Sequence, residues 1–341
     1  MKHMSVELMS ELNDAYQVPE GTLEHLRTQS WAPLPGLLNA DTVKTMLEQV
    51  QKYAAPVQPS ETEKWMTSDE YAKVLQSHDG MAWTDNWFRD LALSPRLTGV
   101  ALDLLDESEG LFIHDMTFTK PGHEGGPTPF HQDYPFWPFD RKGAFTIWIA
   151  MTDLTADMGI LQFMPGSHNE GPLGRFSRAP GDDIRKAYPY LEDKYGFAGG
   201  TDLKAGDATV HYDLTVHGAN GNQTTRGRAA YTLRYMPTDV IYTGAPHRHF
   251  DAFEMTPGEL FADSPQVPHI SRLSWLRMVG VTRPSGTTHR RPSCCAGLMS
   301  NTSISAAPRS TVPVAHDSVA EIAVAEWIQR SRIDHPCLCR R

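Results

Sequence analysis

The chain has 341 residues, a formal net charge of −10 and a hydrophobic fraction of 40%. These values are typical of a globular protein with a core of its own, built as one large or two ordinary domains. The acidic balance argues against nucleic acid and against an anionic membrane surface as partners, because both need a basic stripe. No apolar run approaches the length of a membrane span and none follows the N-terminus, so we expect a cytoplasmic protein without a secretory leader.

Cysteine usage points to the same compartment. Residues 1–293 contain no cysteine, so the folded part cannot depend on disulfides and suits a reducing cytosol. The chain's cysteines are Cys294, Cys295, Cys337 and Cys339. Their spacings, adjacent or with one residue between, do not match those of a zinc site.

The first third of the chain has the apolar period of helices. We predict an N-terminal helical segment at residues 1–34 and supporting helices at 41–106. Asp41 is expected to cap a helix that continues to Tyr53, and a capping box at 67–70 is expected to open another. These helices have apolar faces but no residue set that suggests chemistry, so we expect them to cover a sheet.

From Gly110 the period changes to two, which is typical of strands. Short alternating runs separated by Gly and Pro lie at residues 111–119, 145–151, 160–164, 207–212 and 229–236. Such a series predicts a mainly β fold with flanking helices, with the core at 110–237 arranged as a double-stranded β-helix, that is, a cupin-like jelly roll.

A His-x-Asp motif at His131 and Asp133 lies inside this β region. On a strand, side chains two residues apart point to the same face, so the two could bind one metal ion. The same motif recurs at 211–213 and 249–251, and a motif this short needs context. Only the first copy is followed at a suitable distance by a further His-Gly and by an Arg eleven residues beyond that His.

That sequel consists of His217 and Arg228. Two imidazoles and one carboxylate on one face suit Fe(II) and leave coordination positions open. A 2-oxo acid chelated there would still need an anchor for its distal carboxylate, and a guanidinium is the best side chain for that purpose. His211 is a second candidate for the distal ligand, at a less suitable distance from Arg228. The alternative is that these are ordinary buried histidines and a surface arginine.

Five stretches taken together carry a resemblance to a known family. They are residues 118–122, 131–133, 146–151, 159–168 and 206–236. In this combination the sequence resembles the phytanoyl-CoA dioxygenase family of Fe(II)- and 2-oxoglutarate-dependent oxygenases. The resemblance implies an oxygenase domain at 35–273. After it the composition shifts to Ser, Thr, Arg and Pro, which predicts a low-complexity, disordered tail at 274–341.

Residue by residue, the resemblance implies iron held by His131, Asp133 and His217, with the distal carboxylate of 2-oxoglutarate on Arg228. Three further matching positions are expected to line the co-substrate pocket, namely Lys120, Thr146 and Trp148. Ala219 departs from the family, which often has Ser at this position, so a hydroxyl contact to 2-oxoglutarate is expected to be missing.

The implied reaction uses Fe(II), 2-oxoglutarate and O2 to hydroxylate, desaturate or cyclise an unactivated C–H position of a small organic molecule, with a natural-product intermediate as the first guess. Succinate and CO2 are released. Two alternatives stay open: a cupin-type iron dioxygenase that does not use 2-oxoglutarate, and a non-catalytic jelly-roll module that binds a ligand. The sequence also leaves a homodimer open.

One long insert interrupts the β region at residues 169–203. It is rich in Gly and Pro and contains several aromatic side chains. Long loops inside compact domains often have a function, so we expect a lid whose aromatics set substrate specificity. The alternative is a packed surface loop.

Overall fold

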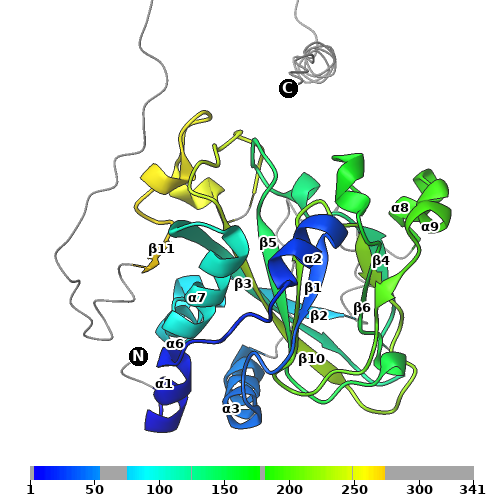
Figure 1. Cartoon of the computed structure of the whole chain (residues 1–341), viewed down its shortest axis with the longest axis horizontal. Coiled ribbons are helices and arrows are strands. Elements are labelled where there is room, and N and C mark those ends of the chain that lie inside the picture. The colour runs from blue at the N-terminus through cyan, green and yellow to red at the C-terminus, as the bar shows by residue number, and fades with distance from the viewer. Residues whose placement is uncertain (1–3, 54–74, 124, 177–180, 248, 273–341) are drawn as a thin grey trace, which may run out of the picture. The chain divides into compact units, whose positions relative to one another are not determined.

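A computed structural model describes residues 4–53, 75–123, 125–176, 181–247 and 249–272 (Figure 1). All of these residues belong to one compact unit, Met1–Pro284. The expected tail at 274–341 and the capping box at 67–70 lie outside the described residues. Among the residues that the structure describes, no helix combines the length and the apolar character needed to cross a membrane.

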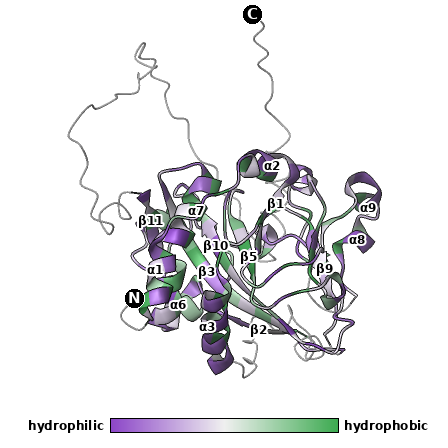
Figure 2. Cartoon of the chain, turned by 60° about the horizontal axis from the view of Figure 1, so that its bottom comes forward, coloured by the Kyte–Doolittle hydropathy of each residue, from purple (hydrophilic) through white to green (hydrophobic). Residues whose placement is uncertain are grey.

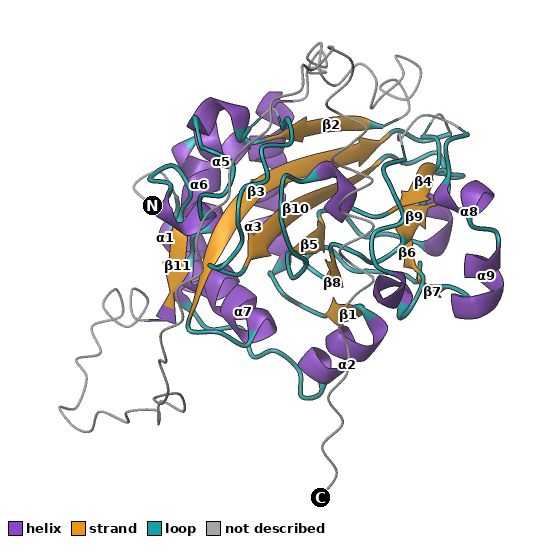
Figure 3. Cartoon of the chain, turned by 90° about the horizontal axis from the view of Figure 1, so that it is seen from above, coloured by secondary structure: helices purple, strands orange, loops and turns teal. Residues whose placement is uncertain are grey.

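The larger of two antiparallel sheets has seven strands, which Figure 3 shows from above. In space the order is β1, β8, β5, β10, β3 and β11. Strand β2 also pairs with β3, at the end of β3 away from β11. The bounds are β1 (Trp31–Leu34), β2 (Gln76–Asp79), β3 (Glu109–Lys120), β5 (Phe145–Ala150), β8 (Ala208–Tyr212), β10 (Arg228–Met236) and β11 (His269–Ser271).

The smaller sheet has four strands in the order β4, β9, β6 and β7. Its strands are β4 (Thr128–His131), β6 (Leu161–Phe163), β7 (Ala198–Gly199) and β9 (His217–Ala219). The two sheets pack face to face, because Trp31 of β1 stacks on Phe163 of β6 with ring centroids 4.9 Å apart. This arrangement confirms the predicted jelly roll.

The central strands β5 and β10 are buried along their whole length. One face of these strands points toward the smaller sheet, and the other is covered by helices. On the helical side, the ring centroids of Phe88 and Tyr231 lie 5.8 Å apart. Burying one large apolar side chain such as Phe88 stabilises the fold by about 1.5–3 kcal/mol. Figure 2 shows the resulting contrast between the hydrophobic strand β5 and the hydrophilic surface of helix α9.

The helices before β3 cover the outer face of the larger sheet, as Figure 1 shows for α3, α6 and α7. Over the whole described part of the chain, the helices are α1 (Val6–Asn13), α2 (Thr22–Gln29), α3 (Ala40–Val50), α5 (Met81–Thr84), α6 (Asn86–Ala92), α7 (Pro95–Leu105), α8 (Ile184–Ala187) and α9 (Tyr190–Tyr195). Short 3₁₀ turns are η1 (Gln51–Tyr53), η2 (Tyr134–Phe136), η3 (Ala156–Met158), η4 (Ser167–Glu170), η5 (Asp251–Phe253) and η6 (Phe261–Asp263).

Helices are present within residues 1–34 and 41–106 as predicted, but the prediction missed two strands in these ranges, β1 and β2. These strands are only four residues long, too short for an alternation to be distinguished from a helical pattern. The predicted cap of α3 was also wrong. Asn39, not Asp41, is the extended residue before the helix, and its side chain accepts a hydrogen bond of 2.8 Å from the backbone N–H of Thr42.

The insert at 169–203 forms small elements in its described part, which excludes 177–180. Ile184 of α8 and Leu191 of α9 are fully buried. They belong to a separate apolar cluster with Phe130, Met164 and Val216. Through this cluster, the described part of the insert packs next to the strands β4 and β9.

Candidate metal centre

Two strands of the smaller sheet bring the candidate histidines together. His131 at the end of β4 and His217 at the start of β9 are direct register partners, with ring centroids 4.4 Å apart. Asp133 does not continue the strand, so the expectation that it shares a strand face with His131 was wrong. Its backbone is αR, at the start of the 3₁₀ turn that contains Pro135. This turn places Asp133 Oδ1 3.5 Å from His131 Nε2 and 3.9 Å from His217 Nε2.

The protonation of both rings follows from their backbone partners. Nδ1 of His131 lies 2.8 Å from the carbonyl oxygen of Pro129, and Nδ1 of His217 lies 2.9 Å from that of Thr215. A carbonyl only accepts, so each Nδ1 carries the proton and each Nε2 presents a lone pair toward Asp133. Burial, with His211 and His131 nearby, holds the pKa of His217 well below its usual value, so this ring is neutral and able to bind metal.

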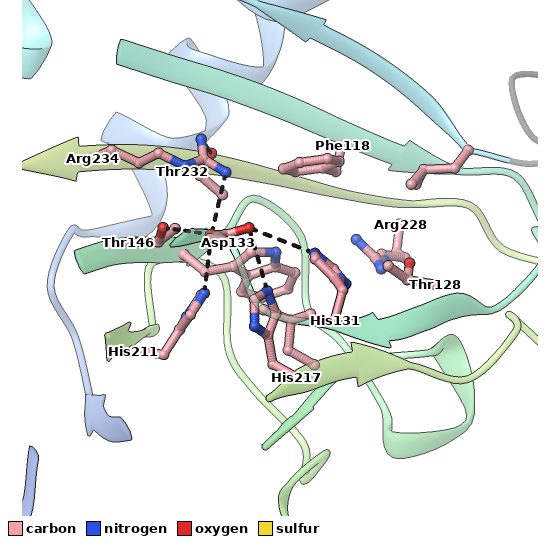
Figure 4. Close-up of a pocket in the computed structure, with 13 residues that line it drawn as sticks. Phe118, Thr128, His131, Asp133, Thr146, His211, His217, Arg228, Thr232 and Arg234 are labelled. Carbon is pink, nitrogen blue, oxygen red and sulfur yellow. Dashed lines mark hydrogen bonds and ion pairs between the residues drawn. The ribbon is translucent and has the colours of Figure 1, made fainter. Parts of the chain in front are cut away.

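The second carboxylate oxygen of Asp133 faces away from this pair of nitrogens. Thr146 Oγ1 donates to Oδ2 at 3.2 Å, and His211 Nε2 and Arg234 Nη2 lie 3.8 and 3.9 Å from it. Burial alone would raise the pKa of Asp133, but the surrounding polar side chains, His131 and His211 foremost and then His217 and Arg234, keep it well below the usual range. The carboxyl group is therefore an anion. Its Oδ2 faces Thr146, His211 and Arg234, and its Oδ1 faces His131 and His217, as Figure 4 shows.

This donor set fits a metal ion. One ligand atom from each of His131, Asp133 and His217 lies within 4.8 Å of the others, and all three side chains are buried. Within the described residues it is the single group of three such side chains with this spacing. Two imidazoles and one carboxylate suit Fe(II). The hydrogen bonds that each Nδ1 donates and that Oδ2 accepts are supporting contacts of the kind that orient metal ligands in proteins.

The three candidate ligands line a buried cavity between the sheets (Figure 4). The wall exposes mainly apolar surface, and three of its polar side chains, Thr146, His211 and Arg234, lie next to Asp133. The other lining residues are Leu75, Phe118, Thr128, Thr146, Trp148, Leu161, His211, Arg228, Thr232 and Arg234. The predicted Thr146, Trp148 and Arg228 thus lie in one cavity with the candidate ligands.

Arg228 is the first residue of β10 and is buried. Its Nη2 donates to the carbonyl oxygen of Gly159 at 2.9 Å, and its guanidinium lies 5.5 Å from the ring centroid of Trp148. These contacts hold a permanent positive charge inside the cavity. A planar guanidinium in such a position can bind a carboxylate through two hydrogen bonds.

Lys120 is the register partner of Arg228 on β3, but its side chain is not among those that line the cavity. Its Nζ donates to the carbonyl oxygen of Asn220 at 2.9 Å. Burial, together with the charge of Arg228, lowers the pKa of Lys120 to about 6. Lys120 is therefore a largely neutral amine at neutral pH, on the strand next to that of Arg228.

Sequence reasoning missed two groups that contact Asp133. Arg234 was not considered, although an even spacing of six residues from Arg228 places both on one face of a strand. His211 was considered only as a metal ligand. The structure places its ring 4.2 Å from that of His217, with its Nε2 toward Asp133 Oδ2. The strand register would have revealed both residues, because His211 pairs with Thr146 and Thr146 pairs with Arg234 on neighbouring strands.

The described part of the insert lies beside a second hollow and contributes no residue to the lining of the metal cavity. This hollow lies between α8, α9 and the ends of β4 and β9. Its lining includes Phe130, Asp183, Arg185, Glu192 and Ala219. The guanidinium of Arg185 lies 4.2 Å from the ring centroid of Phe130 and pairs with both acidic side chains. Thr128 lines both hollows, so the two adjoin at β4.

Comparison with curated proteins identifies relatives over part of the chain. The chain is 28% identical over 168 residues to phytanoyl-CoA dioxygenase domain-containing protein 1 of Mus musculus, covering 48% of this chain and 55% of that protein. It is 31% identical over 157 residues to phytanoyl-CoA dioxygenase of Arabidopsis thaliana, covering 46% and 54%. The chain therefore spans about half the length of these relatives. Identity to L-proline trans-4-hydroxylase of Streptomyces griseoviridis is 23% over 225 residues, covering 60% of this chain and 81% of that protein.

Solved structures share the fold over most of their length. A non-haem α-ketoglutarate-dependent carbocyclase, SnoK from nogalamycin biosynthesis, superposes with a TM-score of 0.63 at 21% identity, covering 75% of this chain and 97% of that one. The epimerase SnoN from the same biosynthesis gives 0.59 at 23%, covering 73% and 97%. The family profile described as phytanoyl-CoA dioxygenase matches residues 31–230, more than half of the chain. This confirms the resemblance in the sequence motifs: the chain belongs to the phytanoyl-CoA dioxygenase family.

Proposed function

We propose that the protein is an Fe(II)- and 2-oxoglutarate-dependent oxygenase acting on an unactivated C–H position of a small organic molecule. The observation that carries this proposal is one buried cavity that contains both a His-Asp-His donor set and the guanidinium of Arg228. Membership of the phytanoyl-CoA dioxygenase family supports it. His131, Asp133 and His217 hold the iron in this proposal.

The residues of the chain bind and orient the reactants. Arg228 holds the distal carboxylate of 2-oxoglutarate, while Trp148 packs on its guanidinium and Thr146 fixes Asp133. Apolar side chains such as Phe118 and Leu161 exclude water from the cavity and hold an organic substrate. When bound, iron with O2 and 2-oxoglutarate supplies an oxidant strong enough for an aliphatic C–H bond, and 2-oxoglutarate leaves as succinate and CO2.

A natural-product intermediate is the substrate class that we favour. The structures with the same fold include a carbocyclase and an epimerase of nogalamycin biosynthesis, and one relative is an L-proline hydroxylase. Hydroxylation, desaturation and ring closure all begin with attack on a C–H bond, so one site suits each of them. We further propose that the protein acts in the cytoplasm. The homodimer stays a prediction.

The insert at 169–203 is proposed to act as the lid. Its helices α8 and α9 border a hollow that adjoins the metal cavity at Thr128, which is where a substrate larger than the cavity would extend. Phe197 supports this placement because it is 47% exposed and packs its ring against Phe130, next to His131.

The alternatives leave specific features without a purpose. A cupin-type iron dioxygenase that does not use 2-oxoglutarate gives no role to the buried charge of Arg228. A ligand-binding module without metal gives no role to the two Nδ1–H hydrogen bonds that direct both Nε2 lone pairs toward one carboxylate oxygen.

The test is turnover of 2-oxoglutarate to succinate by the purified protein with Fe(II) and O2. We expect succinate from wild type, faster when a substrate is present, and none from His217→Ala. Arg228→Met should raise the KM for 2-oxoglutarate by at least about tenfold, because a charged, bidentate contact is lost. Bound iron with no succinate under any condition would favour the cupin-type enzyme, and no bound iron would favour the binding module.

A further inference from the structure

His131 is connected to the insert through one peptide group of β4. Its Nδ1 donates to the carbonyl oxygen of Pro129 at 2.8 Å. The same peptide group carries the backbone N–H of Phe130, which donates to Oδ2 of Asp183 at 3.0 Å. Because a peptide group is planar and rigid, a hydrogen bond at its N–H also fixes the direction of its carbonyl oxygen. Asp183 therefore acts on the imidazole of His131 through a single peptide group.

The register of β4 explains why a side chain of the insert binds this N–H. Between the pairs Thr128–Ala219 and His131–His217, β4 has one residue more than β9. An extra residue of this kind is left out of the ladder of strand hydrogen bonds. The N–H of Phe130 lies in this irregular interval and donates to the insert. The insert thus completes the backbone hydrogen bonding of the strand that ends at a candidate metal ligand.

Asp183 is an anion that is itself held in place. It is the extended residue before α8, which Figure 3 shows beside β4, and its Oδ1 accepts from the backbone N–H of Arg185 at 2.9 Å. The guanidinium of Arg185 donates to both carboxylate oxygens at 2.8 Å. Burial alone would raise the pKa of Asp183, but hydrogen bonds from Arg185 and from the backbone N–H of Phe130 hold it below its usual value. A charged acceptor makes a stronger hydrogen bond, and hydrogen bonds in a chain polarise one another.

His217 has the same arrangement with a neutral acceptor. Its Nδ1 donates to the carbonyl oxygen of Thr215 at 2.9 Å, and the N–H of that peptide group, which belongs to Val216, donates to Oγ of Ser167 at 2.8 Å. Ser167 is fully buried and lies in the turn η4, where the insert begins. The chain therefore provides its own comparison between a charged and an uncharged acceptor behind the two histidines.

We infer that Asp183 is a positioning residue for iron, acting on His131 through the Pro129–Phe130 peptide group. The inference rests on the proposed function, because it concerns a ligand assigned to iron there. The carboxylate fixes the orientation of the ring and strengthens the hydrogen bond of its Nδ1–H, which raises the basicity of Nε2 toward a metal. Ser167 supports His217 in the same way without a charge. The proposed lid and the metal centre are thus coupled, because moving α8 away from β4 breaks this connection.

The experiment uses the protein loaded with Co(II) in place of Fe(II), together with 2-oxoglutarate. Paramagnetic Co(II) moves the proton NMR signals of its ligands far outside the normal range. We expect two such signals that exchange with solvent, from the Nδ1–H groups of His131 and His217. Asp183→Ala should change the position of one signal and speed its exchange, and Ser167→Ala should do the same to the other. Asp183→Ala should also weaken Co(II) binding by about tenfold.

Two further variants separate charge from structure. Asp183→Asn keeps the shape, an acceptor oxygen and a good N-cap for α8, so it should change the same signal as Asp183→Ala by less. Glu192→Gln is the matched control, because Glu192 on α9 accepts from Arg185 at 2.9 Å and has no hydrogen bond to β4 among the described residues. Its two signals and its Co(II) affinity should equal those of wild type.

The outcomes separate this inference from the proposed function. If wild type shows no shifted imidazole signal with Co(II), the proposed metal site fails, and the inference fails with it. If two signals appear, the inference is overturned when Asp183→Ala leaves both unchanged, even with a lower Tm, or changes the same signal as Ser167→Ala. If Asp183→Ala does not fold, Asp183→Asn decides, because signals identical to those of Glu192→Gln would contradict a role of the Asp183 charge.

Discussion

Asp133 shows how a single side chain is divided between support and binding. Its Oδ1 faces the two Nε2 atoms of the candidate ligands, and its Oδ2 accepts a hydrogen bond from Thr146. Because both oxygens belong to one rigid carboxylate, fixing Oδ2 also fixes the direction of Oδ1. We therefore propose that Thr146 positions Asp133 for metal binding, in addition to lining the cavity.

This role predicts the effect of Thr146→Val, which keeps the shape of the side chain and removes the hydroxyl. Loss of such a supporting hydrogen bond should weaken Fe(II) binding by about tenfold, measured by competition with a chromophoric chelator. The matched control is Thr209→Val, because the buried Thr209 hydroxyl has no hydrogen-bond partner among the described residues. Equal affinities for the two variants would contradict the assigned role.

At the scale of elements, Asp115 joins three of them. Its carboxylate on β3 accepts hydrogen bonds from the backbone N–H of Ala82 in α5, at 3.0 and 3.2 Å, and from the hydroxyl of Tyr231 on β10, at 2.6 Å. Asp115 is fully buried. Burial raises its pKa to about 6, although the hydrogen bonds from Tyr231 and Ala82 oppose the shift.

The raised pKa predicts how stability depends on pH. The folded state keeps the proton of Asp115 up to about pH 6, whereas the unfolded chain loses it near 3.8. Folding therefore binds a proton in this window, so the free energy of unfolding should fall as pH rises from about 4 to 6. The contribution is about 3 kcal/mol for a shift of this size and should be missing in Asp115→Asn, compared by urea denaturation. Parallel pH profiles for the two proteins would contradict it.

The insert carries a prediction at the same scale. Its apolar residues pack on β4 and β9, while its outer part borders the hollow next to the cavity. Replacing Phe197 and Tyr190, which are both exposed, by Ser should change which substrates stimulate succinate release and leave Fe(II) affinity unchanged. Substrate preference identical to that of wild type would show that the insert is a packed surface loop.

The sequence predicted several strands of the core and missed much of the local geometry. The short apolar runs between Gly and Pro located β3, β5, β6, β8 and β10, although β5 and β10 are buried along their whole length and do not alternate in burial. The same reasoning did not locate β1 or β2, which have four residues each and lie among helices. Asp133 was assigned to the metal site for the wrong geometric reason, because a 3₁₀ turn with Pro135 directs its carboxylate. Arg234 was missed because its contacts depend on strand register, which no short motif in the sequence specifies.

At the scale of the whole molecule, the residues proposed to bind iron and 2-oxoglutarate come from both sheets. The candidate histidines lie on the smaller sheet, and Arg228 lies on β10 of the larger one. A metal with 2-oxoglutarate bound between them would hold the sheets together in the folded state only. The sequence bears a net charge of −10, yet the cavity between the sheets collects two guanidiniums. The position of charge inside the fold, more than its total, therefore decides which ligands bind.

This arrangement predicts stabilisation by ligands. Mn(II), as a redox-inert substitute for Fe(II), together with 2-oxoglutarate should raise the Tm of wild type. At 100 times the Kd, one ligand contributes about 2.7 kcal/mol. The chelator EDTA should reverse the shift, and His217→Ala should not show it. A shift of the same size in His217→Ala would mean that the ligands bind elsewhere.

The most direct test of the metal and co-substrate site is an anaerobic titration of the protein with Fe(II) and then 2-oxoglutarate, followed by the weak visible charge-transfer band of the chelate. We predict a band in wild type that is lost in His217→Ala and that needs much more 2-oxoglutarate in Arg228→Met. Thr209→Val should behave as wild type. A wild-type protein that binds Fe(II) but shows no band, or a band indifferent to both substitutions, would contradict the assignment of this cavity.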